Sequence, residues 1–198
     1  DTLNIAVGSF ANVTVGNGSG SLTSTIGNPY RTGAGTTTHR LQYLVAKSEL
    51  DAAGILAGNI NSLSMTTSST MTGSITNYEI KLAHTTATNM TTTFLTPTFT
   101  SLFSAAALTV VAPGVNLHTF SSPFNWNGND NIVIEICYST VTGTTATTVA
   151  NTTTPHITTP TIHATGGGCT AATGSTSTLR PQFIFNALSG TAMSSITW

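Results

Sequence analysis

Residues 124–139, FNWNGNDNIVIEICYS, hold the densest group of side chains that could do chemistry. The side-chain oxygens of Asn127, Asn129 and Asp130 surround Gly128, a spacing that suggests a calcium loop. A Ca²⁺ site normally supplies several carboxylates and this stretch has one, so a tight turn capped by its own Asx side chains is favoured. Because Asn-Gly is a strong two-residue hairpin signal, we expect a hairpin turn here and no cofactor, with calcium as the alternative.

The apolar run after this turn carries a cysteine and an acid on the same face. Strict alternation places Glu135 and Cys137 opposite to the isoleucines, on the side that faces away from the core. The chain has two cysteines, so the partner available to Cys137 is Cys169, within the Gly-rich segment 166–174. A chain that reads as secreted favours a disulfide, and closing about 30 residues would stabilise the fold by roughly 3–4 kcal/mol. A catalytic thiol would need an electropositive setting, which the sequence does not supply.

Other catalytic patterns are missing from the sequence. The five histidines do not occur in HExxH or a comparable metal-binding spacing, and there is no GxSxG, P-loop or GxGxxG motif. A glycosidase needs two carboxylates at a set separation, and six scattered acidic residues do not identify such a pair. We therefore expect a protein that is not an enzyme.

Three aromatic residues could stack on a sugar ring, namely Trp126, Tyr30 and Tyr43. For Trp126 the favoured alternative is packing at the rim of the core, because a Trp beside a turn usually packs there. Arg180 precedes the terminal strand and could bind a carboxylate ligand, but pairing with Glu135 or with backbone carbonyls is favoured.

The composition points to an extracellular β-protein. Charged residues make up 6% of the chain, against roughly 25% in ordinary soluble domains. Two Lys and three Arg cannot form the basic stripe that nucleic acids or anionic membranes require. No apolar run approaches the length of a membrane-spanning helix. The first ten residues lack a signal-peptide pattern, so a secreted protein would have lost that segment, or the chain is a piece of a longer one.

Hydrophobic alternation predicts an all-β fold. In residues 74–85, for example, Tyr78, Ile80 and Leu82 share one face, as expected of a half-buried strand. Further strands are expected at 39–45, 60–65, 94–103, 107–111, 115–120, 132–138 and 182–188. One short helix is expected near residues 48–53, with Ser48 and Asp51 as a capping box and Gly54 as its end.

About ten short strands separated by turn signals favour an antiparallel, jelly-roll-like β-sandwich. We expect residues 1–188 to form this single domain. Residues 189–198 lose the strand rhythm and stop on Trp198, so we expect a linker or the start of a following module there.

Four segments resemble a module of large secreted surface proteins of Bacteroidetes bacteria. They are YLVAKSELDAAGILAGNINSLSM, YEIKLAHTTATNMTTTF, FSSPFNWNGNDNIVIEICYS and GCTAATGSTSTLRPQFIF, and they span roughly residues 40 to 186. The resemblance implies a jelly-roll-like sandwich in a multidomain exported protein, often an adhesin or an accessory part of an enzyme. It also implies the Cys137–Cys169 bridge, and it carries over no catalytic residues.

Three functions follow as hypotheses. The first is a non-catalytic extracellular structural or adhesion module that contacts a surface glycan or protein through its loops. The second is a carbohydrate-binding module that uses the three aromatic residues above. The third is a subunit of a self-assembling extracellular filament, because a chain with so little charge lacks the usual repulsion at its strand edges.

Overall fold

The computed structural model describes residues 2–3, 8–18, 20–23, 26–32, 38–108, 113–143, 147–164, 168–190 and 196–197. These residues form fifteen β-strands, the helix α1 (Lys47–Ala52) and the 3₁₀ turn η1 (Gly168–Thr170). Ten strands have five or more residues and the other five have two or three. The expected all-β fold with about ten strands and one short helix is confirmed.

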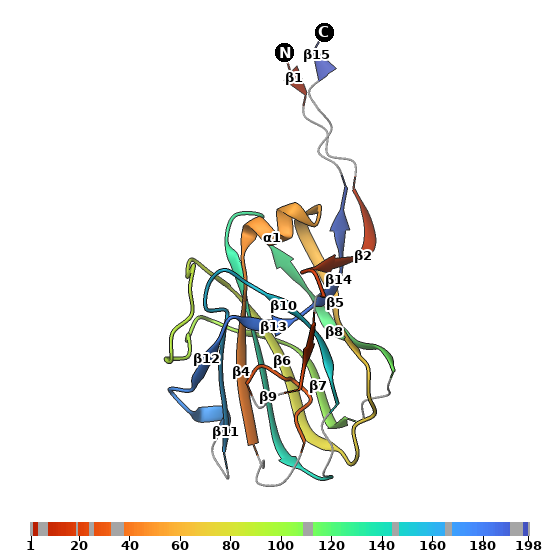
Figure 1. Ribbon diagram of the computed structural model, residues 1–198. Helices are drawn as coiled ribbons and strands as arrows, with labels where there is room; N and C mark the ends of the chain where they lie inside the picture. The colour runs from red at the N-terminus through yellow and green to blue at the C-terminus, as the bar shows by residue number, and fades with distance from the viewer. Residues whose placement is uncertain are drawn as a thin grey trace.

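Two antiparallel sheets pack face to face (Figure 1). Sheet 1 contains β2 (Ser9–Val15), β3 (Gly20–Leu22), β5 (Ile55–Thr67), β8 (Gly114–Trp126), β10 (Val149–Thr153), β13 (Leu179–Pro181) and β14 (Phe183–Ser189). Sheet 2 contains β12 (Ser175–Ser177), β11 (Thr159–Ala164), β4 (Thr38–Val45), β9 (Asn131–Val141), β6 (Ile75–Thr85) and β7 (Thr100–Leu108), in that spatial order. The chain passes repeatedly from one sheet to the other, as a jelly-roll-like sandwich requires.

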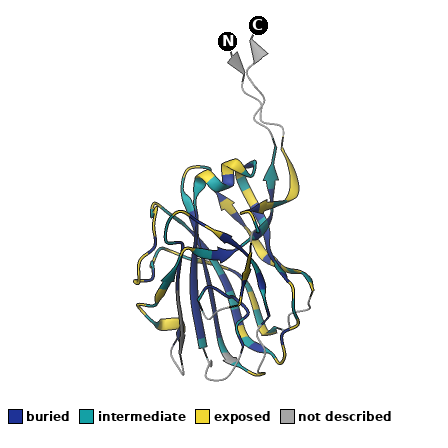
Figure 2. Ribbon diagram, in the orientation of Figure 1, coloured by how far each residue is buried: buried dark blue, intermediate teal, exposed yellow. Residues whose placement is uncertain are grey.

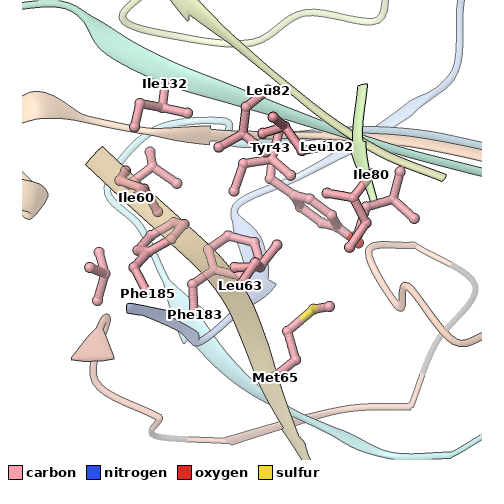
Figure 3. Packing of buried hydrophobic residues seen from close by; sticks show 14 of the residues in the cluster. Tyr43, Ile60, Leu63, Met65, Ile80, Leu82, Leu102, Ile132, Phe183 and Phe185 are labelled. Atoms are coloured by element: carbon pink, nitrogen blue, oxygen red, sulfur yellow. The ribbon is translucent and has the colours of Figure 1, made fainter. Parts of the chain in front are cut away.

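The inward-facing side chains follow the predicted alternation. Ile132, Ile134 and Ile136 of β9 all lie in the main core, and so do the predicted core residues of β6, namely Tyr78, Ile80 and Leu82. Sheet 1 contributes the facing layer, which includes Ile60, Leu63, Met65, Phe183 and Phe185 (Figure 3). Burying large apolar side chains between two sheets is the main stabilising contribution to such a fold.

The helix α1 is capped differently from the prediction. Glu49, rather than Asp51, accepts a hydrogen bond from the backbone N–H of Ala46 at 2.9 Å, so the cap begins two residues earlier than expected. Asp51 instead pairs with Lys47 one turn away. Gly54 ends the helix with a φ of 78°, as predicted.

One strand prediction is wrong in part, and another lies partly outside the described residues. Residues 94–99 are not a strand, since β7 begins at Thr100, and part of the predicted strand 107–111 lies outside the described residues. The expected hairpin at Gly128 is also wrong, because β8 pairs with β5 in sheet 1 whereas β9 pairs with β4 and β6 in sheet 2. The turn therefore carries the chain from one sheet to the other.

The termini form a separate short pair. Thr2 lies opposite Thr197 and Leu3 opposite Ile196, so β1 (Thr2–Leu3) and β15 (Ile196–Thr197) are antiparallel. Residues 191–195 and 198 lie outside the described residues. The linker or following module expected at 189–198 stays a prediction.

Candidate functional site

The turn at 127–130 uses its polar atoms on itself. The Asn127 side-chain oxygen accepts the backbone N–H groups of Asn129 and Asp130 at 2.9 and 3.0 Å. The Asn127 amide donates to the Asp130 carboxylate at 2.7 Å. This is the capped Asx turn that the sequence favoured. Within the described residues, no group of three or more His, Cys, Asp or Glu side chains could hold a metal ion.

The three predicted sugar platforms lie inside the protein, which corrects that hypothesis. Trp126 is 1% exposed and donates its indole N–H to the Asp130 carbonyl oxygen at 2.8 Å. Tyr43 and Tyr30 are fully buried in the main core. A sugar cannot stack on a buried ring, so none of the three is a binding platform in this fold. In β4, Tyr43 lies on the same inward face as Leu41 and Val45.

The buried tyrosines instead form an aromatic layer between the sheets. Tyr78 stacks on Tyr30, His118 and Tyr138, with ring centroids 5.5 to 5.9 Å apart. The Tyr30 hydroxyl lies 2.6 Å from Nε2 of His118, and the Tyr43 hydroxyl donates to the Gly27 carbonyl at 2.9 Å. Hydroxyls that are paired in this way can be buried at little cost.

Burial sets the ionisation of this layer. It lowers the pKa of His118 to about 4, so this imidazole is neutral at physiological pH. It raises the pKa of Tyr30, Tyr43, Tyr78 and Tyr138 above the ordinary value, so these phenols stay protonated. The layer is therefore an uncharged structural element of the core.

The predicted disulfide is present on the outer side of sheet 2. Cys137 of β9 is bonded to Cys169 of η1, with their Cα atoms 5.7 Å apart. The bond attaches the segment after β11 to the sheet. A hydrogen bond from the Gly168 N–H to the Thr38 hydroxyl, at 3.0 Å, holds the same segment against β4.

Beside the disulfide lies a buried ionic cluster. Arg40 donates from Nε and Nη2 to Oε2 of Glu135 at 3.0 and 2.7 Å, and Gln42 donates to the same oxygen at 2.8 Å. Lys81 approaches the other carboxylate oxygen at 3.8 Å. The Arg40 guanidinium also stacks on the Phe94 ring, 4.5 Å from its centroid.

A cover over sheet 2 explains why this outward-facing cluster is buried. A second small core forms from Leu44, Ala83, Met90 and Val133, with Leu95, Phe99 and Ile157 packed against it. Backbone hydrogen bonds from Met90 to Ile157 and from Phe94 to Ala172 join the covering segments to each other. We did not predict this cover from the sequence, because we expected a strand at 94–103; the apolar residues that recur through 90–99 without regular alternation were a signal for it.

Arg180 is also a structural residue. Its guanidinium is fully buried, pairs with Glu49 of α1, and donates to the Pro181 carbonyl at 3.0 Å. Pairing with a backbone carbonyl is confirmed, whereas the expected partner Glu135 is wrong. Burial lowers the pKa of Arg180 and the Glu49 carboxylate opposes that shift. The pair anchors α1 to sheet 1.

Two hollows flank α1 at one end of the sandwich. The larger, about 520 Å³, has a largely apolar surface, and its lining includes Ala46, Pro155, Lys47, Glu49 and His156. The smaller, about 350 Å³, lies on the other side of Glu49. Both volumes fall in the usual range for small-ligand sites.

The outer surface of sheet 1 is partly exposed and uncharged, and we call it the amide face. Its side chains are Phe10, Asn12, Thr14, Asn59, Asn61, Val115, Leu117, Thr119, Asn125, Ile184, Asn186 and Leu188. None of them is charged, and the single charged residue in the strands of sheet 1 is the buried Arg180.

Side-chain hydrogen bonds run across the strands of the amide face. Asn61 donates to Asn186 at 3.1 Å, and Asn186 donates to Asn12 at 3.0 Å. Asn125 donates to Asn59 at 3.1 Å. Large apolar side chains stand among these amides, with Phe10, Val115 and Leu117 between 53% and 61% exposed. Exposed apolar groups within an uncharged polar surface are typical of a contact region.

Comparisons with protein-family models, curated proteins and solved structures found no match for this chain. In the described part of the chain, no helix is long and apolar enough to cross a membrane.

Proposed function

We propose that the protein is a non-catalytic structural or adhesion module of a secreted or cell-surface protein, and that the amide face is its contact surface. The observation that carries the proposal is the absence of charge from the outer surface of sheet 1. The carboxylates of Glu135 and Glu49 pair with Arg40 and Arg180, and the pairs Lys47–Asp51 and Lys81–Glu79 lie on α1 and on sheet 2. The outer surface of sheet 1 has no charged side chain.

An uncharged surface of amides, hydroxyls and aliphatic groups suits adhesion. Amides offer both a hydrogen-bond donor and an acceptor, so they can satisfy varied polar partners. Exposed aliphatic side chains add apolar burial on contact. The absence of charge makes such contacts insensitive to salt, because there is little Coulombic interaction for ions to screen.

An extracellular location is supported by the disulfide. A disulfide forms and persists mainly in oxidising compartments, and Cys137–Cys169 is bonded in this fold. A fold that is closed by a disulfide would suit a module that functions outside the cell.

The test is a bead-adhesion assay with the purified chain. Microspheres coated with the chain are presented to bacterial cells, to polysaccharide-coated glass and to protein-coated glass. Leu117→Lys, which puts a charge on the amide face, should reduce attachment severalfold at low salt. Thr98→Lys changes an exposed residue in the cover of sheet 2 and is the matched control. Equal attachment by both variants would refute the role of the amide face.

As a second candidate we propose sugar binding in the larger hollow beside α1, which involves none of the three aromatic residues expected from the sequence. The lining of this hollow is largely apolar and includes the exposed hydroxyl of Thr88, which could exchange a hydrogen bond with a sugar hydroxyl. Glycan-array binding that is lost in Thr88→Ala, an exposed residue of the lining, with the thermal midpoint little changed, would favour this candidate. Binding that is unaffected by that change would argue against the hollow.

A further inference from the structure

The strand β2 differs from the other edge strands in having no protection against a further strand. Edge strands are usually shielded by short length, proline, charge or bulges. Here β3, β12 and β13 have three residues each, β8 contains Pro123, and the β6–β7 pairing has a register shift. By contrast β2 has seven residues, Ser9–Val15, with no proline and no charge.

One edge of β2 is fully paired, and the other is open as far as the described residues go. Its register with β14 runs without interruption from Val15 opposite Phe183 to Ser9 opposite Ser189. Among the described residues, β14 is the only strand paired with β2. Five of its seven residues are exposed, as Figure 2 shows by the yellow ribbon at the rim of the sandwich. The open edge therefore presents backbone donors and acceptors to solvent.

The hydrogen-bonded amides of sheet 1 end at this open edge. They run from Asn61 through Asn186 to Asn12, which is the central residue of β2. The Asn12 side chain is exposed, and its oxygen accepts one hydrogen bond from Asn186. An amide oxygen has a second lone pair, and an amide nitrogen has two donors, so Asn12 retains capacity for a further amide.

From these observations we propose that β2 pairs antiparallel with β2 of a second copy of this chain, about a two-fold axis at Asn12. Centring the axis there overlaps all seven residues, more than any shifted register would. Asn12 then lies opposite Asn12 of the other copy, and the row of amides continues across the interface. Phe10 lies opposite Thr14 of the other copy, an aromatic and β-branched pair of the kind that stabilises sheets.

The open edge of β2 is complementary to itself, so the partner that fits it is a second copy of this chain. Ser9–Val15 carries no titratable side chain, so two identical edges meet without repulsion at any pH. The interface uses the same patch on both copies and is therefore closed, which predicts a dimer rather than a filament. This goes beyond the proposed function, because the dimer would present two amide faces on the same side.

Cysteine cross-linking tests the register directly. Both native cysteines are in the disulfide, so an introduced cysteine is the free thiol in the described chain. Two Asn12→Cys copies would have Cα atoms about 4.5–5.5 Å apart, which a disulfide can span. Two Thr14→Cys copies would be separated by about 14 Å, the rise of four residues, and cannot bond. A mixture of Phe10→Cys and Thr14→Cys should form the mixed dimer.

The expected result under oxidised glutathione is a covalent dimer for Asn12→Cys and for the mixture, and monomer for Thr14→Cys alone. Cross-linking of Thr14→Cys as fast as Asn12→Cys would overturn the register, and no cross-linking of any variant would overturn the dimer.

Sedimentation equilibrium of the unmodified chain gives an independent test. We expect concentration-dependent dimers, weakened roughly tenfold by Asn12→Lys because two ammonium groups would face each other. Asn125→Lys, which places the same charge on the edge strand β8, should leave the dimer intact. A chain that is monomeric at about 1 mM would overturn the proposal. Because dimerisation is measured in solution, its failure would leave the adhesion assay of the amide face unaffected.

Discussion

The outer faces of the two sheets differ, because one is covered by other segments of the chain and the other is open. The outer face of sheet 2 carries Arg40, Glu135 and Cys137, and it is closed over by residues 90–99 and by the disulfide-bonded segment. The outer face of sheet 1 carries amides, hydroxyls and apolar groups, and it is open. Figure 2 shows the contrast as a dark blue β4 and a largely yellow β2.

This difference indicates which sheet stabilises the fold and which sheet could contact a partner. The Arg40–Glu135 ion pair and the Cys137–Cys169 disulfide lie where sheet 2 is covered, and they hold the cover in place. The open face keeps neutral side chains, which cost little to desolvate compared with charges when a partner arrives. Sheet 2 is thus the frame of the molecule and sheet 1 its candidate contact surface.

The largest expected effect comes from breaking the ion pair under the cover. Glu135→Leu would leave the Arg40 guanidinium buried without its carboxylate, and should lower the free energy of unfolding by roughly 3–5 kcal/mol. Urea unfolding followed by tryptophan fluorescence measures this change. In the double variant Glu135→Leu with Arg40→Met, most of the loss should be recovered. A single variant as stable as the parent would show that the cover does not bury the pair.

Removing the disulfide should weaken the same region. Replacing Cys137 and Cys169 with Ala opens a closure of 32 residues and should cost roughly 3–4 kcal/mol in the chain-entropy model. Hydrogen exchange should show the loss first in 168–173 and in the covering segment that bonds to it. Uniformly raised exchange over both sheets would contradict a local role for the bond.

His118 and Leu117 are neighbours in β8 that lie on the inner and outer faces of sheet 1. His118 is 2% exposed and Leu117 is 61% exposed. Because burial lowers the pKa of His118 to about 4, the unfolded chain takes up a proton near pH 6.5 while the folded chain does not. Stability should therefore fall by roughly 3 kcal/mol as the pH drops from about 6.5 to about 4.

The control for this pH dependence is His118→Gln, which keeps a polar group beside Tyr30 but does not titrate. Unfolding free energies of both proteins are measured between pH 4 and 7. The parent should lose more stability on acidification than the variant. Parallel pH profiles would mean that His118 is not the titrating group.

The smallest expected effect is on the open face itself. Leu117→Thr removes an exposed apolar side chain and should change the free energy of unfolding by less than about 0.5 kcal/mol. Thermal unfolding checks this value against Leu44→Ala, under the cover of sheet 2, where a loss of roughly 2–5 kcal/mol is expected. Comparable losses would mean that the open face is structural.

Local patterns in the sequence predicted much of the fold. The alternation in 74–85 and 132–138 identified the core faces of β6 and β9, and Gly54 marked the end of α1. The Cys137–Cys169 bond followed from the presence of two cysteines in a chain that reads as secreted. The faces of β6 and β9 and the end of α1 depend on residues close in sequence. The disulfide could be predicted because two cysteines allow only one pairing within the chain.

The buried polar contacts and the amide face were less predictable, because both depend on contacts between distant residues. Tyr30 lies in a loop without periodicity, and its burial results from packing on Tyr78 and His118. Arg180 meets Glu49 across 131 residues. The Asn-Gly turn predicted a sharp reversal of the chain. Which sheet each flanking strand joins depends on pairing with distant strands, namely β5 for β8 and β4 and β6 for β9.

The sequence by itself determined which residues face inward, since a period of two is a property of each strand alone. It also determined that the surface would be neutral, because so few ionisable residues exist. Tertiary structure alone decided which outward face would be covered and which left open, since that depends on where residues 90–99 and 168–173 fold back. The amides of sheet 1 form a row for the same reason: Asn12, Asn61 and Asn186 become neighbours when their strands pair.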